Sequence, residues 1–127
     1  MSLEALCLAT AIYFESKNEP LKGQYSVAEV VLNRRDNSRY PNTICKVVSQ
    51  KNQFSWQRGD NHMRVPYKAK TNELYKQEWD KAVKIANDSL KNKTNYTKGA
   101  LFFNRSGLGV RYKTDVKPCK IGNHIFY

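Results

Sequence analysis

Cysteine and histidine are scarce and widely spaced in this chain. It has three cysteines, Cys7, Cys45 and Cys119, and two histidines, His62 and His124. None of them shows the paired spacing of a zinc site, so neither a metal nor another cofactor is expected. Cys7 lies inside an apolar segment and is predicted to pack in the core. Cys45 and Cys119 are the alternative candidates for a disulfide, but free thiols are the favoured prediction because no export signal is visible.

Long hydrophobic runs are also absent. The longest apolar stretch covers residues 5–14, interrupted only by Thr10, whereas a membrane-spanning helix needs about 20 apolar residues. No basic segment precedes this stretch and no cleavage site of small residues follows it, so we interpret it as folded structure and not as a signal peptide. Repeats, low-complexity segments and linkers are missing. Residues 1–127 are therefore predicted to form one domain, expected to be a monomer.

Acidic residues are half as numerous as basic residues. The chain has 11 Asp and Glu against 22 Lys and Arg, which gives a formal net charge of +11. Such an excess attracts polyanions, among them nucleic acid, an anionic cell envelope and acidic lipid. The charge alone does not choose among these partners.

One of the few acidic residues, Glu15, ends the apolar segment. Residues 3–15 are predicted to form a helix that is apolar on every side and therefore buried. Leu8, Ala11 and Ile12 share the helical face of Glu15. Burial and the negative end of the helix dipole both favour the protonated carboxyl, which is the form that a general acid requires. The alternative is that Glu15 simply marks the point where the helix reaches water.

The remaining pattern indicates helices first and a small sheet last. Helices are predicted over residues 21–34, over a short segment capped by Thr43, and from a cap at Thr71 or Asn72 to about residue 90, where one face is basic and solvated. Residues 50–70 are predicted to be mainly loop. Strands are predicted at residues 100–103, 110–112, 119–121 and 124–127, and Gly122-Asn123 forms the turn between the last two.

Six segments carry a resemblance to a known family. They are residues 11–15, 19–24, 27–34, 40–45, 53–56 and 121–127. In this order they resemble the SleB-type, spore-cortex-lytic cell wall hydrolase family, and the resemblance covers essentially the whole chain. It implies an α+β, lysozyme-like, mostly helical domain with a small C-terminal antiparallel β-sheet.

The resemblance also implies an activity. Family members cleave the glycan strands of peptidoglycan, and the implied reaction is lytic transglycosylation between N-acetylmuramic acid and N-acetylglucosamine, which leaves a 1,6-anhydro end. Glu15 matches the acid of the family. Substrate contacts are expected from seven further residues: Gln24, Asn33, Phe54, Ser55, Trp56, Asn123 and His124. A structural role is the alternative for His124 (a hydrogen bond) and for Asn33 (a helix cap).

The number of carboxylates separates two reactions. Ordinary glycosidases need two carboxyl groups that flank the bond, whereas a lytic transglycosylase needs only one. The candidates for a second group are Glu19, Glu29 and Asp60. Glu19 is expected at the start of the second helix and Glu29 is expected to face solvent, so neither is framed by apolar residues as Glu15 is. Glu29 is the first candidate if the reaction is hydrolysis.

The sequence departs from the family at one place. Where family members often carry a His-Tyr pair, this chain has Leu101-Phe102-Phe103, so a phenylalanine is expected to replace the histidine by stacking.

A basic domain without a visible signal peptide suits a bacteriophage endolysin that is made in the host cytoplasm and acts on the murein layer. The rival interpretations are a nucleic-acid-binding module, suggested by the charge, and a catalytically inactive wall-binding domain.

Overall fold

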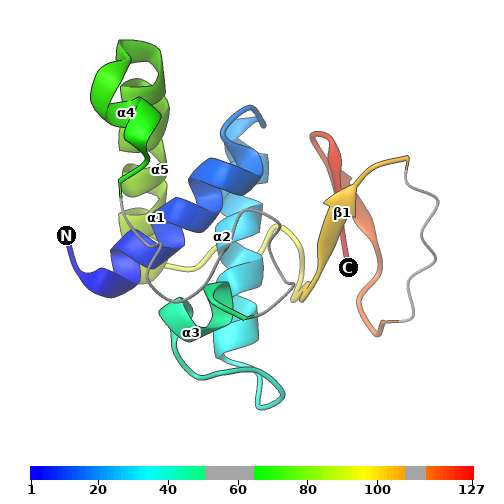
Figure 1. Cartoon of the computed structure of the whole chain (residues 1–127). Helices are drawn as coiled ribbons and strands as arrows, with labels where there is room; N and C mark the ends of the chain where they lie inside the picture. Colours follow the sequence, from blue (N-terminus) through cyan, green and yellow to red (C-terminus); the bar gives the residue numbers. More distant parts are fainter. Residues whose placement is uncertain (51–64, 108–113) are drawn as a thin grey trace.

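Helices occupy one side of the molecule and a small sheet occupies the other (Figure 1). The computed structural model describes residues 1–50, 65–107 and 114–127. Within these ranges the elements are α1 (Leu3–Ser16), α2 (Leu21–Arg35), α3 (Ile44–Val48), α4 (Tyr67–Thr71), α5 (Glu73–Lys91), β1 (Phe103–Arg105), β2 (Cys119–Ile121) and β3 (His124–Phe126). None of these helices is long and apolar enough to cross a membrane.

Helix α1 is the centre of the helical part. It begins at the cap of Ser2, whose Oγ accepts a hydrogen bond from the Ala5 N–H (3.1 Å). It packs against α2, α3 and α5. Leu8 and Ile12 are fully buried, which explains why the sequence of this helix is apolar all round.

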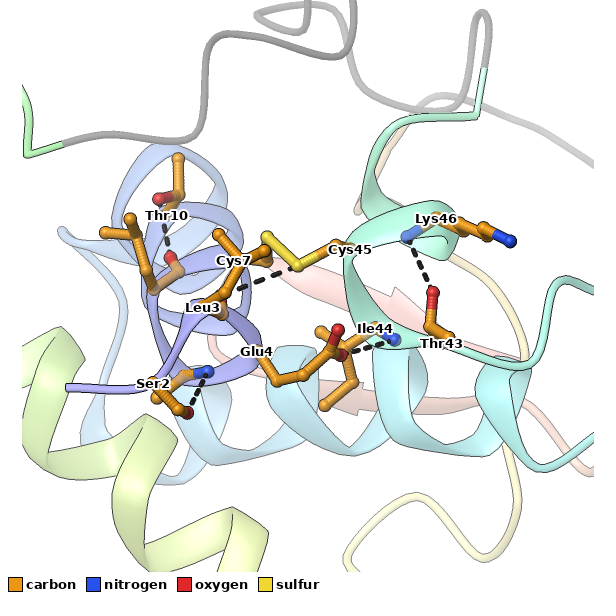
Figure 2. The surroundings of a disulfide bond; sticks show 11 residues. Ser2, Leu3, Glu4, Cys7, Thr10, Thr43, Ile44, Cys45 and Lys46 are labelled. Atoms are coloured by element: carbon orange, nitrogen blue, oxygen red, sulfur yellow. Dashed lines mark hydrogen bonds between the residues drawn. A yellow bond between two sulfur atoms is a disulfide. The ribbon is translucent and has the colours of Figure 1, made fainter.

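A disulfide joins α1 to α3. Cys7 and Cys45 form this bond, as Figure 2 shows. Their Cα atoms lie 5.2 Å apart. Beside it, Glu4 Oε2 accepts a hydrogen bond from the Ile44 N–H (2.8 Å) at the start of α3. The prediction of free thiols is therefore wrong for Cys7 and Cys45. Cys45 pairs with Cys7 and not with Cys119, the partner considered from the sequence. Cys7 is buried as expected. Because 38 residues separate it from Cys45 in the sequence, no local pattern indicates that its helical face packs against α3.

The sheet has the strand order β1-β3-β2 and is antiparallel throughout. The predicted turn at Gly122-Asn123 is confirmed, and Gly122 has a φ of 60°. Strand β1 starts three residues later than predicted, because Phe103 to Arg105 pair with β3. A turn follows at Ser106-Gly107, and the expected strand at residues 110–112 lies outside the described residues.

Helix α2 contributes to both parts of the core. Its Ala28 and Val31 pack with the helical cluster, while its Val27 and Val30 pack with a second cluster that includes Phe126 of the sheet. The long helix α5 begins at the predicted cap Asn72. Helix α4 forms where a loop was predicted, because Pro66 and Ala69 are buried and anchor this turn.

Candidate active site

A cleft of about 530 Å³ lies between the C-terminal end of α1 and the β2–β3 hairpin. It brings together Glu15, Asn123 and His124, three of the residues predicted from the sequence. Its lining is made of Phe14, Glu15, Ser16, Lys17, Asn18, Glu19, Arg105, Ser106, Asn123 and His124. The α1–α2 turn and the tip of the β2–β3 hairpin face each other (Figure 1), and Glu19 in the turn is hydrogen-bonded to Asn123 in the hairpin.

Glu15 is the last residue but one of α1 and is partly exposed. The end of the helix is held by the Ser16 hydroxyl, which donates to the Ile12 carbonyl (2.7 Å), and by the Lys17 N–H, which donates to the Tyr13 carbonyl (3.2 Å). The buried helix thus carries the carboxyl group of Glu15 to the cleft. This geometry suits an acid that must meet a substrate while its helix stays fixed in the core.

Glu19 is the second carboxylate of the cleft, and its oxygens are bonded to the hairpin. Oε1 accepts a hydrogen bond from the Asn123 N–H (2.7 Å) and Oε2 accepts one from the Asn123 amide Nδ2 (2.9 Å). The side chain of Glu19 is only 8% exposed. It does not cap α2, whose N-cap is Pro20.

His124 lies half-buried in the cleft wall. Its Nδ1 is 3.6 Å from Glu19 Oε1, and its ring packs edge-on against Phe103. Burial lowers the pKa of His124; the Glu19 carboxylate partly offsets this and the Arg105 charge adds to it. The imidazole is therefore mainly neutral at neutral pH.

Gln24 and Asn33 do not line the cleft. Gln24 is 1% exposed, and its Nε2 donates to the Glu19 carbonyl (3.0 Å). Asn33 donates from Nδ2 to the Ala100 carbonyl (2.9 Å) and accepts at Oδ1 from Lys93 Nζ (2.8 Å). These contacts hold the fold together, and substrate contacts by the two amides stay predictions. Phe54, Ser55 and Trp56 lie outside the described residues.

The expectation that Glu29 faces solvent is wrong. Glu29 is 1% exposed. Its Oε1 accepts from Thr94 Oγ1 (2.9 Å) and the Tyr96 N–H (2.7 Å), and its Oε2 accepts from the N–H (2.9 Å) and the hydroxyl of Thr97. Such a carboxylate fixes the segment after α5 and is not presented to the cleft.

The phenylalanines at the departure from the family pack against the protein's own rings. Phe102 stacks on Tyr127 with 5.3 Å between ring centroids, and Phe103 contacts His124 at 5.2 Å. The buried Arg34 guanidinium lies 5.6 Å from the Phe102 ring, and its Nε donates to the Leu101 carbonyl (2.7 Å). Burial lowers the pKa of Arg34, while the nearby Tyr40, Tyr127 and Glu15 raise it.

Sequence reasoning missed part of the cleft wall. Arg105 and Ser106 line the cleft from the end of β1, and Glu19 binds a partner 104 positions away in the chain. The sequence signal that could have indicated the role of Glu19 is its position, four residues after Glu15 and directly before Pro20, the N-cap of α2. Within the described ranges, no group of three His, Cys, Asp or Glu side chains is arranged to hold a metal ion.

The fold and this cleft define a lysozyme-like domain with an acidic residue at the end of a buried helix. Two solved structures share the fold. The catalytic domain of Bacillus cereus SleB has a TM-score of 0.69 and 25% identity, covering 98% of this chain and 88% of that one. The catalytic domain of the germination-specific lytic transglycosylase SleB from Bacillus anthracis has a TM-score of 0.69 and 24% identity, covering 99% and 94%.

The chain belongs to the cell wall hydrolase family, whose model matches residues 18–127. The matched range begins just after Glu15. Curated relatives include the spore cortex-lytic enzymes of Bacillus cereus, 42% identical over 48 residues (38% of this chain, 18% of that protein), and of Bacillus subtilis, 42% identical over 41 residues (32% and 13%). The matches span less than a fifth of these relatives. The resemblance and the fold class predicted from the sequence are confirmed.

Proposed function

We propose that this protein cleaves the glycan strands of peptidoglycan by lytic transglycosylation, with Glu15 as general acid and then general base. The observation that carries the proposal is the position of Glu15 at the end of a buried helix and in the wall of a cleft. Family membership and the likeness to SleB catalytic domains support the same substrate class.

The reaction needs one carboxyl group. Glu15 protonates the bridging oxygen between N-acetylmuramic acid and N-acetylglucosamine while the bond from C1 of the muramyl sugar to this oxygen breaks. The Glu15 carboxylate then takes the proton from the 6-hydroxyl of the same sugar, and O6 bonds to C1. The products are a free 4-hydroxyl and a 1,6-anhydro end. No water is consumed, and Glu15 regains its proton.

The surroundings of Glu19 and Glu29 support this choice, while Asp60, the third candidate, lies outside the described residues. Both carboxylate oxygens of Glu19 accept hydrogen bonds from Asn123, and Glu29 is buried under the Thr94–Thr97 segment. Neither is poised to activate a water molecule as the second carboxylate of a hydrolase must be. Asn123 and His124 line the opposite wall and are proposed to contact the sugar chain.

The proposed role is bacterial cell lysis, as in a bacteriophage endolysin that is made in the host cytoplasm and acts on the murein layer. The net charge of +11 favours retention at an anionic envelope. The Cys7–Cys45 disulfide supports action in an oxidising compartment outside the cytoplasm. Directing the protein to the periplasm is expected to lyse cells, and Glu15→Gln is expected to abolish that lysis.

The decisive experiment compares Glu15→Gln with Glu73→Gln on purified sacculi. Glu73 is an exposed carboxylate in the first turn of α5 and serves as the matched control. Glu15→Gln is expected to lower turbidity clearance by at least about 100-fold, because general acid–base catalysis contributes that much. Glu73→Gln is expected to clear normally, and both variants should melt like the parent protein.

Mass spectrometry of the digest identifies the reaction. Anhydro-muropeptides are the expected products, whereas reducing muramyl ends would mean hydrolysis. Full clearance by Glu15→Gln would remove Glu15 from the reaction. An intact protein that binds sacculi but releases nothing would be a wall-binding domain, and salt-sensitive DNA binding without release would favour the nucleic-acid alternative.

A further inference from the structure

We propose that Glu19 is a positioning residue, which holds the β2–β3 hairpin in place as the second wall of the cleft opposite Glu15. The inference rests on the proposed function, because it concerns how the cleft receives a glycan strand. It gives Glu19 a role that differs from that of a second catalytic carboxylate.

The contact between Glu19 and the hairpin is paired and shielded. The two oxygens of Glu19 each accept one hydrogen bond from Asn123, at 2.7 Å from its backbone N–H and at 2.9 Å from its side-chain amide. Hydrogen bonds that involve a charged group are stronger than neutral ones. With its side chain 8% exposed, Glu19 fixes the hairpin tip both in position and in rotation.

The approach of the hairpin is close enough to exclude a side chain at Gly122. A Cβ atom there would lie 2.6 Å from Glu19 Oε1 and 2.8 Å from Pro20 Cδ. The φ of 60° at Gly122 is also a conformation that favours glycine. The sequence of the turn is therefore matched to contact with Glu19 and Pro20, and not only to the hairpin itself.

On its other side, Glu19 is tied to the end of α1. Its N–H donates to the Ser16 carbonyl (2.9 Å), and its own carbonyl accepts from Gln24 Nε2 (3.0 Å). Ser16 follows Glu15 directly. Glu19 thus fixes the distance between the proposed acid and the hairpin, and the buried Gln24 supports Glu19 from α2.

The contact extends through the hairpin to the rest of the wall. The Asn123 carbonyl accepts from the Ser106 N–H (2.7 Å), and His124 pairs in register with Arg105. These four residues are the whole contribution of the sheet to the described lining of the cleft. A shift of the hairpin tip would therefore move this entire wall relative to Glu15.

Exchange of the two partners tests the inference. Glu19→Gln alone removes the charge from the contact. The Asn123 amide can turn its Oδ1 toward the new NH₂ group, so both hydrogen bonds remain but join neutral partners and are weaker. Asn123→Asp alone sets two carboxylates against each other. In the double variant Glu19→Gln/Asn123→Asp, the backbone N–H of residue 123 still donates to an oxygen at position 19. Donor and acceptor are exchanged only in the side-chain bond, where the new amide donates to the new carboxylate, and the net charge is preserved.

Binding is measured with N-acetylglucosamine–N-acetylmuramic acid oligosaccharides in a Glu15→Gln background, so that no turnover occurs. Asn123→Asp is expected to weaken binding about tenfold, which corresponds to one lost hydrogen bond to a charged group, and Glu19→Gln is expected to weaken binding less. The double exchange is expected to bind more tightly than Asn123→Asp alone, and the loss that remains measures the direct contact between Asn123 and the sugar chain. In the background with Glu15 intact, the single variants should raise KM more than they lower kcat, because Glu19 does not take part in the proton transfers.

Hydrogen exchange at the amides of Asn123 and Ser106 reports the hairpin independently of any substrate. Faster exchange in the single variants and protection in the double variant are expected. Parent-like binding and protection in both single variants would overturn the inference. A double variant as impaired in kcat as Glu15→Gln would mean that Glu19 acts through its own charge. If the parent cleaves no sacculi, the proposed function fails, while the exchange data still decide whether Glu19 holds the hairpin.

Discussion

At the scale of single residues, three glutamates show how surroundings decide the use of a carboxyl group. Glu15 stands in the cleft wall, Glu19 holds a hairpin, and Glu29 is enclosed by hydrogen-bond donors. The apolar frame of Glu15 was visible in the sequence because its neighbours on the helix are local. The partners of Glu29 lie 65 to 68 positions away, so no local pattern distinguished a buried anchor from an exposed carboxylate.

Glu29→Gln is predicted to lower stability without changing the reaction. The replacement turns an NH₂ group toward donors from Thr94, Tyr96 or Thr97, and the unmet hydrogen bonds are expected to cost about 3 kcal/mol. Urea unfolding measures the change, with the exposed Glu73→Gln as the control. Activity per folded molecule should equal that of the parent. A stable variant with altered products would instead return Glu29 to the list of catalytic candidates.

At the scale of elements, local patterns predicted what local forces determine. Helices α1, α2 and α5 and the last hairpin were expected because apolar periodicity, caps and the Gly-Asn turn lie within each segment. Strand β1 was shifted because its limits depend on pairing with β3. Helix α4 was missed because it is held by the burial of Pro66 and Ala69, and the sequence alone does not show that these two residues are buried.

The disulfide between α1 and α3 is predicted to stabilise the helical part. Closing a loop with a sequence separation of 38 restricts the unfolded chain by about 4 kcal/mol in the chain-entropy account. Cys7→Ser/Cys45→Ser is therefore expected to lower the urea midpoint strongly, and reduction of the parent should reproduce the loss. Cys119→Ser is the control, because Cys119 is a free thiol. An unchanged midpoint in the double variant would show that the Glu4–Ile44 contact and packing suffice to hold α3.

At the scale of the whole molecule, positive charge is unevenly distributed along the chain. The expected basic face of α5 is partly neutralised, since Lys76 pairs with Asp80 (2.8 Å) and Lys84 with Asp88 (2.9 Å). Residues 91–127 contain eight Lys and Arg against one Asp, and this part of the chain carries the sheet and one wall of the cleft. The chain's charge excess is therefore largest in the C-terminal segment, whereas the cleft lining itself has Lys17 and Arg105 against Glu15 and Glu19.

Two variants with the same change in net charge test this uneven distribution. Lys117→Glu/Lys120→Glu reverses exposed charges near β2, and Lys76→Glu/Lys84→Glu reverses the paired lysines of α5. In a Glu15→Gln background, the first variant is expected to lose more sedimentation with anionic sacculi. The difference should vanish between about 0.1 M and 1 M salt, because the Debye length falls from about 10 Å to 3 Å. Equal losses would mean that only net charge matters, and salt-independent binding would mean that the sugar contacts alone retain the protein on the wall.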